Sequence, residues 1–372
     1  MASAIVFRAG VRSDDLAEVV AAEGPFVTVY LATDPRSGTP QRAETAWKSL
    51  RRELEEDGAP RAALDAVAPL VGPAHQWGPT LAAVADGSRL LHAEAGPETL
   101  PRDVGRWAPL PSLAPIVEWR QLTPSHVVVL ADRTGADLYA FRREAPDLHR
   151  RVRGADDPHV HRGHPGGWSQ RRYQQVAENL WEENAEQVAA EVARLVEEVD
   201  ARLVAAAGDV RAIGFLREHL PKEVAGLLTT IEGGRRSEAS EDEIEREVAR
   251  IVRAAVDRET AALIETLDQE LAQKDRAVAG AAVTLQGLSM ARAEILLVSD
   301  DPDDDRTAWF GPDPAHAATT ERTLRDLGVA EPQEARLVDV AVRAALGTGA
   351  AIRVIPSDSG VEDGLGAILR WG

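Results

Sequence analysis

The middle of the chain reads His126-Val-Val-Val-Leu-Ala131, then Ala136-Asp-Leu-Tyr-Ala-Phe141, then Leu148 to Val152. These short runs are rich in strand-forming residues and predict three consecutive strands in a meander. After a glycine-rich loop, apolar residues recur at helical spacing from Ser169 to about Asp200, which predicts one helix roughly 47 Å long. A buried-type strand follows at 202–207. This order predicts an α/β domain with a long helix.

The residues before this segment predict a separate, mixed α/β domain. Phe26 to Leu31 alternates like a half-buried strand, and Gln41 to Glu56 has the apolar spacing of a helix. Asp86-Gly87 separates two short apolar runs and predicts a hairpin. Prolines are frequent from Pro97 to Pro115, which suits a loop-rich exit from the domain.

The residues after the middle segment also alternate between helices and strands. Helices are predicted from Val278 to Ala291 and from Ala335 to Leu346, with strands at 294–298 and 351–355. Helices are therefore expected to pack on a central sheet. We predict an α/β protein of three domains, with boundaries at 1–123, 124–274 and 275–372.

Composition limits the partners and the compartment. The 372 residues include 42 Lys and Arg against 61 Asp and Glu, a net charge of -19, so a protein that coats nucleic acid over its whole surface is not expected. The chain has no cysteine, which excludes disulfides and cysteine-based zinc sites. No apolar run reaches the roughly 18 residues of a membrane span, and the N-terminus lacks the features of a secretory signal. We expect a cytoplasmic protein without membrane contact.

One stretch, Arg150 to Tyr173, departs from this acidic background. It holds six arginines and three histidines against only two aspartates. Its glycines let the main chain approach another polymer closely, and Trp168 offers a flat face on which a base could stack. The stretch therefore predicts a loop at 154–170 that contacts RNA.

Helix capping is an alternative explanation of the same residues. Ser169 is a good N-cap, and Trp168 and Tyr173 have the spacing of a hydrophobic staple. Capping does not account for the arginines and histidines around the same turn. Both interpretations stay open.

Three histidines in this loop raise the alternative of a metal site, because imidazole is a common ligand. They are His159, His161 and His164. Pro165 and the glycines after it place them on an irregular loop, and no carboxylate lies at a recognised ligand offset. We therefore expect polar groups that face RNA, with no metal and no other cofactor.

Several motifs, taken in their order along the chain, carry a family resemblance. They are the segment Gly166-Gly-Trp-Ser-Gln170 with its arginines and long helix, and the C-terminal stretches 337–345, 349–355 and 364–371. The chain resembles the bacterial relatives of the archaeal and eukaryotic class 1 release factors and of the stalled-ribosome protein Pelota, a group that includes the ribosome hibernation factor Balon. The resemblance implies a variable N-terminal domain, a middle domain bearing the loop, and a C-terminal domain similar to ribosomal protein L7Ae.

Hydrolytic members of this family carry an uninterrupted Gly-Gly-Gln that places a water beside the ester of peptidyl-tRNA. The resemblance assigns the glycines to Gly166 and Gly167 and the glutamine to Gln170, which is the one catalytic candidate. Trp168 and Ser169 intervene in this chain. Two extra residues would move the glutamine by several ångströms, whereas a misplacement of about 1 Å can cost on the order of 100-fold in rate. Efficient peptide release is therefore not expected.

The leading hypothesis is a non-catalytic factor that occupies the ribosomal A site of idle or stressed ribosomes and extends the loop toward the peptidyl-transferase centre. Two alternatives stay open: a peptidyl-tRNA hydrolase that uses Gln170, and an acidic scaffold that binds only proteins. The resemblance also implies elongation factor Tu or another translational GTPase as a partner of the C-terminal domain, and a monomer off the ribosome. The residues expected to contact RNA are His159, His161, Arg162, His164, Gly166, Gly167, Trp168, Ser169, Gln170, Arg171 and Arg172.

Overall fold

The computed structural model forms two compact units. The first unit combines both ends of the chain, residues 1–121 and 259–372, and the second comprises residues 122–258. The domain boundaries predicted at 123/124 and 274/275 stay predictions. The structure describes residues 16–33, 41–71, 79–98, 100, 102–132, 134–142, 147–153, 167–231 and 241–371, with the backbone alone at 41, 167–181, 241 and 242.

A five-stranded sheet with the order β7-β6-β5-β8-β9 forms the centre of the second unit. The meander predicted from the sequence is confirmed, because β5, β6 and β7 pair antiparallel in chain order. Strands β8 and β9 extend the sheet in parallel with β5. The strands are β5 (His126–Asp132), β6 (Gly135–Phe141), β7 (Leu148–Arg153), β8 (Leu203–Gly208) and β9 (Leu228–Thr230).

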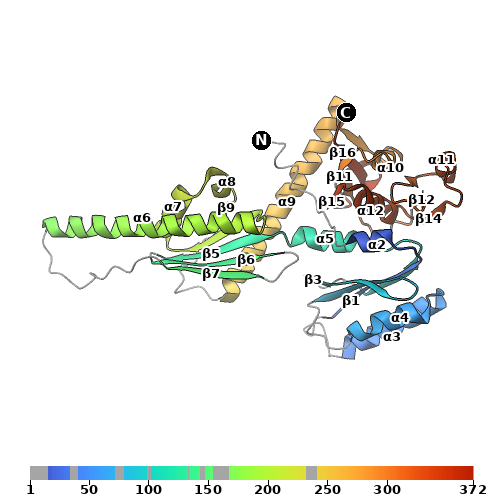
Figure 1. The fold of residues 1–372 in the computed structure, drawn as a ribbon, viewed down its shortest axis with the longest axis horizontal. Coiled ribbons are helices and arrows are strands. Elements are labelled where there is room, and N and C mark those ends of the chain that lie inside the picture. Colours follow the sequence, from blue (N-terminus) through green and yellow to red (C-terminus); the bar gives the residue numbers. More distant parts are fainter. Residues whose placement is uncertain are drawn as a thin grey trace. The chain divides into compact units, whose positions relative to one another are not determined.

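Three helices cover one face of this sheet, α6 (Gly167–Glu198), α7 (Val210–His219) and α8 (Lys222–Ala225) (Figure 1). Val127 and Val129 of β5 point to this face and belong to one buried cluster with residues of α6 and α7. The strand period of two sends the intervening residues to the opposite face. The sheet therefore needs a second apolar cover.

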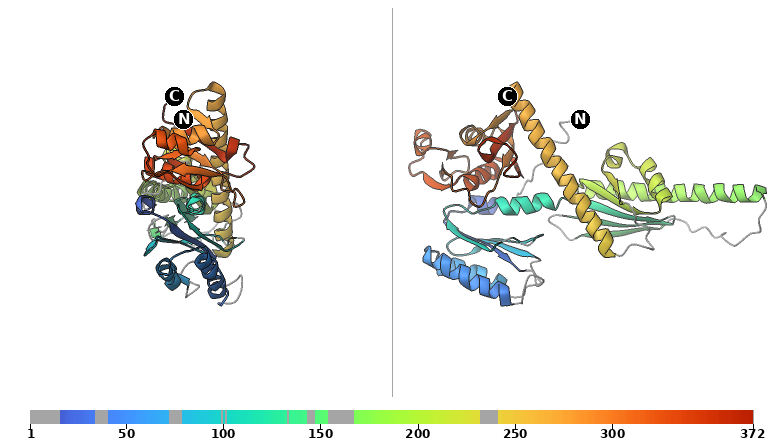
Figure 2. Two further views of the ribbon diagram at one scale, coloured as in Figure 1. Left: turned by 90° about the vertical axis from the view of Figure 1, so that its right-hand side faces the viewer. Right: turned by 180° about the vertical axis from the view of Figure 1, so that it is seen from behind.

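Helix α9 (Glu241–Gln273) supplies that cover through its first half (Figure 2). Val128 of β5 and Leu203 of β8 pack with Ile251 and Val252 of α9. The second unit thus has three layers, with helices on both faces of a largely buried sheet. This arrangement confirms the α/β class predicted from the alternation of strands and helices.

A four-stranded antiparallel sheet, ordered β3-β2-β1-β4, lies in the N-terminal part of the first unit. Helices α3 (Gln41–Glu56) and α4 (Arg61–Val67) pack on one face of it (Figure 1). The predicted hairpin at Asp86-Gly87 is confirmed, since it joins β2 to β3 and the Asp86 carboxylate accepts from the Ser88 and Arg89 amides. The strands are β1 (Phe26–Ala32), β2 (Thr80–Ala85), β3 (Leu90–Gly96) and β4 (Val104–Ala108).

The proline-rich stretch at 97–115 holds more regular structure than the sequence predicts. Strand β4 lies inside it and pairs with β1, and α5 (Ala114–Leu122) begins at its end. Pairing with an existing strand decides the conformation of β4, which its local composition does not reveal.

A second four-stranded sheet, ordered β10-β16-β11-β15, lies in the C-terminal part of the first unit. Helices α10 (Ala281–Ser289) and α12 (Leu337–Thr348) pack on one face, and Leu263 and Leu267 of α9 pack on the other. Beside it lies a small sheet with α11 (Glu321–Asp326). The strands of the two sheets are β10 (Ala277–Ala279), β11 (Ala293–Val298), β15 (Ala351–Val354) and β16 (Leu365–Leu369), and β12 (Thr307–Phe310), β13 (Ala317–Ala318) and β14 (Gln333–Arg336).

Both helices predicted in this part begin later than expected. Residues 277–279 and 333–336 pair as strands before α10 and α12 start. Residues at such junctions satisfy either pattern, and pairing with β16 and β12 selects the strand.

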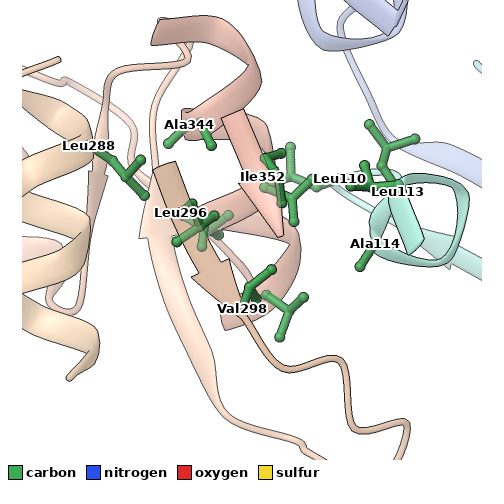
Figure 3. Packing of buried hydrophobic residues seen from close by; sticks show 14 of the residues in the cluster. Leu110, Leu113, Ala114, Leu288, Leu296, Val298, Ala344 and Ile352 are labelled. Atoms are coloured by element: carbon green, nitrogen blue, oxygen red, sulfur yellow. The ribbon is translucent and has the colours of Figure 1, made fainter. Parts of the chain in front are cut away.

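One buried cluster runs from the N-terminal part of the first unit into its C-terminal part. Leu110 and Leu113 lie next to Ile352 of β15 (Figure 3). Polar contacts accompany this packing, because the Gln121 side chain donates to the Val354 carbonyl at 2.8 Å and accepts from the Val354 amide at 2.9 Å. The two ends of the chain therefore share a core. Within the described ranges no helix is both long and apolar enough to cross a membrane.

Candidate functional site

The loop predicted at 154–170 is described only at its C-terminal end. His159, His161, Arg162, His164 and Gly166 lie outside the described residues. The backbone is helical from Gly167 onward, so Trp168, Ser169, Gln170, Arg171 and Arg172 belong to the first turns of α6. The helix starts two residues earlier than predicted, because no residue from Trp168 onward breaks a helix. Ser169 therefore lies within the helix and is not its N-cap.

This start position fixes how the predicted residues are distributed around the helix. Residues three and four apart share a face, so Trp168, Arg171 and Arg172 lie on one side of α6. Gln170 is about 200° around the helix from Trp168. The glutamine and the tryptophan therefore lie on different faces of the same turn.

Strand β7 leads into the loop and carries three of the six arginines of the stretch on two opposite faces. Arg150 faces α6 and forms ion pairs with two glutamates of that helix. Its guanidinium donates to Glu191 Oε1 at 2.6 Å and to Glu198 Oε2 at 2.8 Å. Because these ion pairs connect β7 to α6, Arg150 stabilises the fold of the second unit. It is not part of the exposed positive charge of β7.

Arg151 and Arg153 lie on the other face of β7, where both are exposed. Arg151 Nε donates to the carboxylate of Asp137, which lies directly opposite on β6. The Arg151 side chain is 50% exposed while that of Asp137 is 3% exposed. This hydrogen bond raises the pKa of the Arg151 guanidinium, which therefore stays charged while the Asp137 carboxylate holds it in place.

Asp137 also lies beneath His149, whose Nε2 is 3.5 Å from the same carboxylate oxygen. Asp137 is a residue of the site that no sequence motif predicts. Its signal was a lone carboxylate inside the apolar run Ala136 to Phe141. A buried carboxylate needs a partner, so a cation on the neighbouring strand was the inference to draw.

A metal is predicted to be absent from this site. In the ranges that the structure describes, no three His, Asp or Glu side chains come together in a way that could hold an ion. The three histidines of the loop lie outside those ranges. For them the absence of a metal stays a prediction.

Comparison with known protein sequences gives a family match for the middle of the chain. Residues 125–273 match the sequence model of the bacterial archaeo-eukaryotic release factor family 2. The Mycobacterium tuberculosis protein Rv2629 is 29% identical over 97% of both chains.

Two solved structures are among the matches to this chain. Archaeoglobus fulgidus Pelota has 15% identity, 79% coverage of each chain and a TM-score of 0.33. Archaeal Pelota, solved as a model bound to the ribosome with ABCE1, has 14% identity, 97% coverage of this chain, 95% of that one and a TM-score of 0.36. The family match over residues 125–273 confirms the resemblance of this part of the sequence to the bacterial archaeo-eukaryotic release factors.

Proposed function

We propose that the protein is a ribosome-binding factor that occupies the A site of idle or stressed ribosomes and does not release peptide. The segment 154–172 would extend toward the peptidyl-transferase centre, with Arg162, Arg171 and Arg172 contacting phosphates. The family match over residues 125–273 supports a role in translation. The cations of the segment on a chain of net charge -19 support a local contact with RNA.

The position of Gln170 in α6 carries the non-catalytic part of the proposal. The glutamine of an uninterrupted Gly-Gly-Gln follows its second glycine directly, whereas Gln170 lies three residues beyond Gly167 inside the helix, so the two intervening residues move it by about 3 Å along the helix axis. Orientation of a water for ester hydrolysis tolerates about 1 Å. A glutamine fixed in a helix at this distance from the glycines supports binding without hydrolysis.

The proposal includes the other parts of the factor. By family likeness, the C-terminal domain, 275–372, would contact a translational GTPase such as elongation factor Tu. The factor would act in the cytoplasm as a monomer when it is off the ribosome.

Cosedimentation with purified ribosomes tests the proposal. The native protein should pellet with ribosomes, and its affinity should fall steeply as salt rises, because a phosphate-contacting segment releases counterions. Arg171→Glu combined with Arg172→Glu should lower occupancy. The control Arg322→Glu, at a side chain of α11 that is 91% exposed, should not. Unchanged ribosome occupancy of the double variant would show that the segment 154–172 does not contribute to ribosome binding.

A release assay separates the proposal from the hydrolytic alternative. The native protein should leave peptidyl-tRNA intact on ribosomes that hold it. Release of peptide that disappears in Gln170→Ala would establish a hydrolase instead. Binding that does not depend on salt would favour a scaffold that contacts only proteins.

A further inference from the structure

Four aromatic rings form two stacked pairs on the α9-facing side of the middle sheet. His126 and Phe141, which are directly opposite on β5 and β6, stack with centroids 4.6 Å apart and planes 13° from parallel. Tyr139 and His149, opposite each other on β6 and β7, stack at 4.6 Å and 14°. The rings therefore cross three neighbouring strands in one strip.

Two cations continue this strip along β7. Arg151 and Arg153 follow His149 at the strand period of two, so all three side chains share a face, about 7 Å apart from one to the next. The buried carboxylate of Asp137 accepts from Arg151 and lies 3.5 Å from His149 Nε2. It holds two exposed side chains in defined positions.

The cover of this face supports an outward role for β7. The apolar contacts of α9 reach β5, β8 and the aromatic bodies of β6, where Tyr139 and Phe141 are half-buried. On β7, the edge strand of the sheet, His149, Arg151 and Arg153 are exposed. Charge alone would protect an edge strand from pairing with another chain. A buried carboxylate and a parallel ring stack are not needed for that protection, and burial of the carboxylate has a desolvation cost.

We propose that this surface, formed by Tyr139, His149, Arg151 and Arg153, binds single-stranded RNA. Bases stack on flat aromatic or imidazole rings, and guanidinium groups contact the phosphates between them. A sheet that presents rings and cations on one face has the chemistry for both contacts. The inference rests on the proposed function, since β7 runs directly into the segment 154–172 and would give the factor a second RNA contact beside it.

Fluorescence anisotropy tests the inference on the full chain. The probe is a labelled single-stranded RNA of mixed sequence, about 12 nucleotides long, a length within the roughly 4–16 nucleotides that a single-strand-binding site occupies. His149→Ala should weaken binding about tenfold, the effect of losing one stacked base. Arg153→Ala should lower the slope of log affinity against log salt by about 0.7, the value for one phosphate contact on a single strand. Arg322→Ala, the matched loss of an exposed cation in the first unit, should change neither quantity. His149→Phe keeps a flat ring and should retain most of the affinity.

Equal affinity of the native protein, His149→Ala and Arg153→Ala would overturn the inference, and so would absence of RNA binding by the native protein. Ribosome cosedimentation of the same variants keeps this result separate from the proposed function. If the native protein pellets with ribosomes but does not bind the oligonucleotide, the A-site proposal stands and the β7 surface is removed from it. If His149→Ala weakens oligonucleotide binding while Arg171→Glu with Arg172→Glu leaves ribosome occupancy unchanged, the surface stands and the role of the segment fails.

Discussion

Replacement of Asp339 by asparagine should remove most of the pH dependence of the stability of the first unit. Asp339 lies on α12, is 3% exposed, and accepts a hydrogen bond from Ser112 Oγ at 3.1 Å. Burial raises the pKa of its carboxyl from the ordinary value of 3.8 to about 7, and nearby Asp300 adds to the rise while Arg336 opposes it. The folded unit therefore holds the proton far more tightly than the unfolded chain does.

The sign and size of the effect follow from this difference. Below the unfolded pKa of 3.8 both states are protonated, and the full contribution of the group to stability is present. As pH rises toward 7, unfolding releases the proton and becomes progressively easier. A full shift from 3.8 to about 7 corresponds to about 4 kcal/mol, of which more than half falls between about pH 5 and about pH 8.

Unfolding in guanidinium chloride, followed by tryptophan fluorescence at several pH values in this range, measures the difference. The native protein should lose about 3 kcal/mol more than Asp339→Asn does, because the amide keeps the acceptor for Ser112 and cannot ionise. Asp326→Asn, at a side chain that is 73% exposed, is the matched control and should follow the native curve. Parallel losses in the native protein and Asp339→Asn would show that the carboxyl is not held protonated and would refute the reasoning.

Two further substitutions test the packing of each unit. In the second unit, a Cβ on Gly208 would lie 1.8 Å from the Ala131 carbonyl oxygen at a φ of +135°, so Gly208→Ala should destabilise by about 3 kcal/mol in urea unfolding. Gly214→Ala, where the added carbon meets nothing within 4 Å in a helix, should instead stabilise by up to about 1 kcal/mol, and equal effects of the two changes would contradict the geometry. In the first unit, the Gln121 side chain pairs with both the backbone carbonyl and the backbone amide of Val354, which lies on the edge strand β15. Gln121→Ala removes both hydrogen bonds and should lower the free energy of unfolding by about 3 kcal/mol in thermal unfolding. An unchanged Tm would mean that water replaces the side chain.

Local patterns were sufficient for the middle of the chain. Strand β5 is predictable because Val127 to Ala131 is an uninterrupted apolar run bounded by turn residues. Helix α6 is predictable because its apolar residues keep a helical period over many turns, although this period predicts a start at Ser169, two residues after the observed start at Gly167. The family resemblance rests on this region and on three C-terminal stretches, and the family match covers the middle region alone.

Long-range pairing accounts for what the sequence did not show. Strand β4 lies in a proline-rich stretch and is selected by its pairing with β1. Gln121 pairs with a residue 233 positions away and Ser112 with one 227 positions away, so neither contact has a local signature. The role of Asp137 depends on the register between β6 and β7, which places it opposite Arg151. A meander prediction without register could not place those two side chains together.

The most direct test of the central claim is a structure, by electron cryomicroscopy, of ribosomes incubated with the native protein. The account predicts density for the factor in the A site, with the start of α6 directed at the peptidyl-transferase centre and Gln170 away from the ester of any peptidyl-tRNA. A factor bound elsewhere on the ribosome, or Gln170 beside the ester with a water between them, would contradict it.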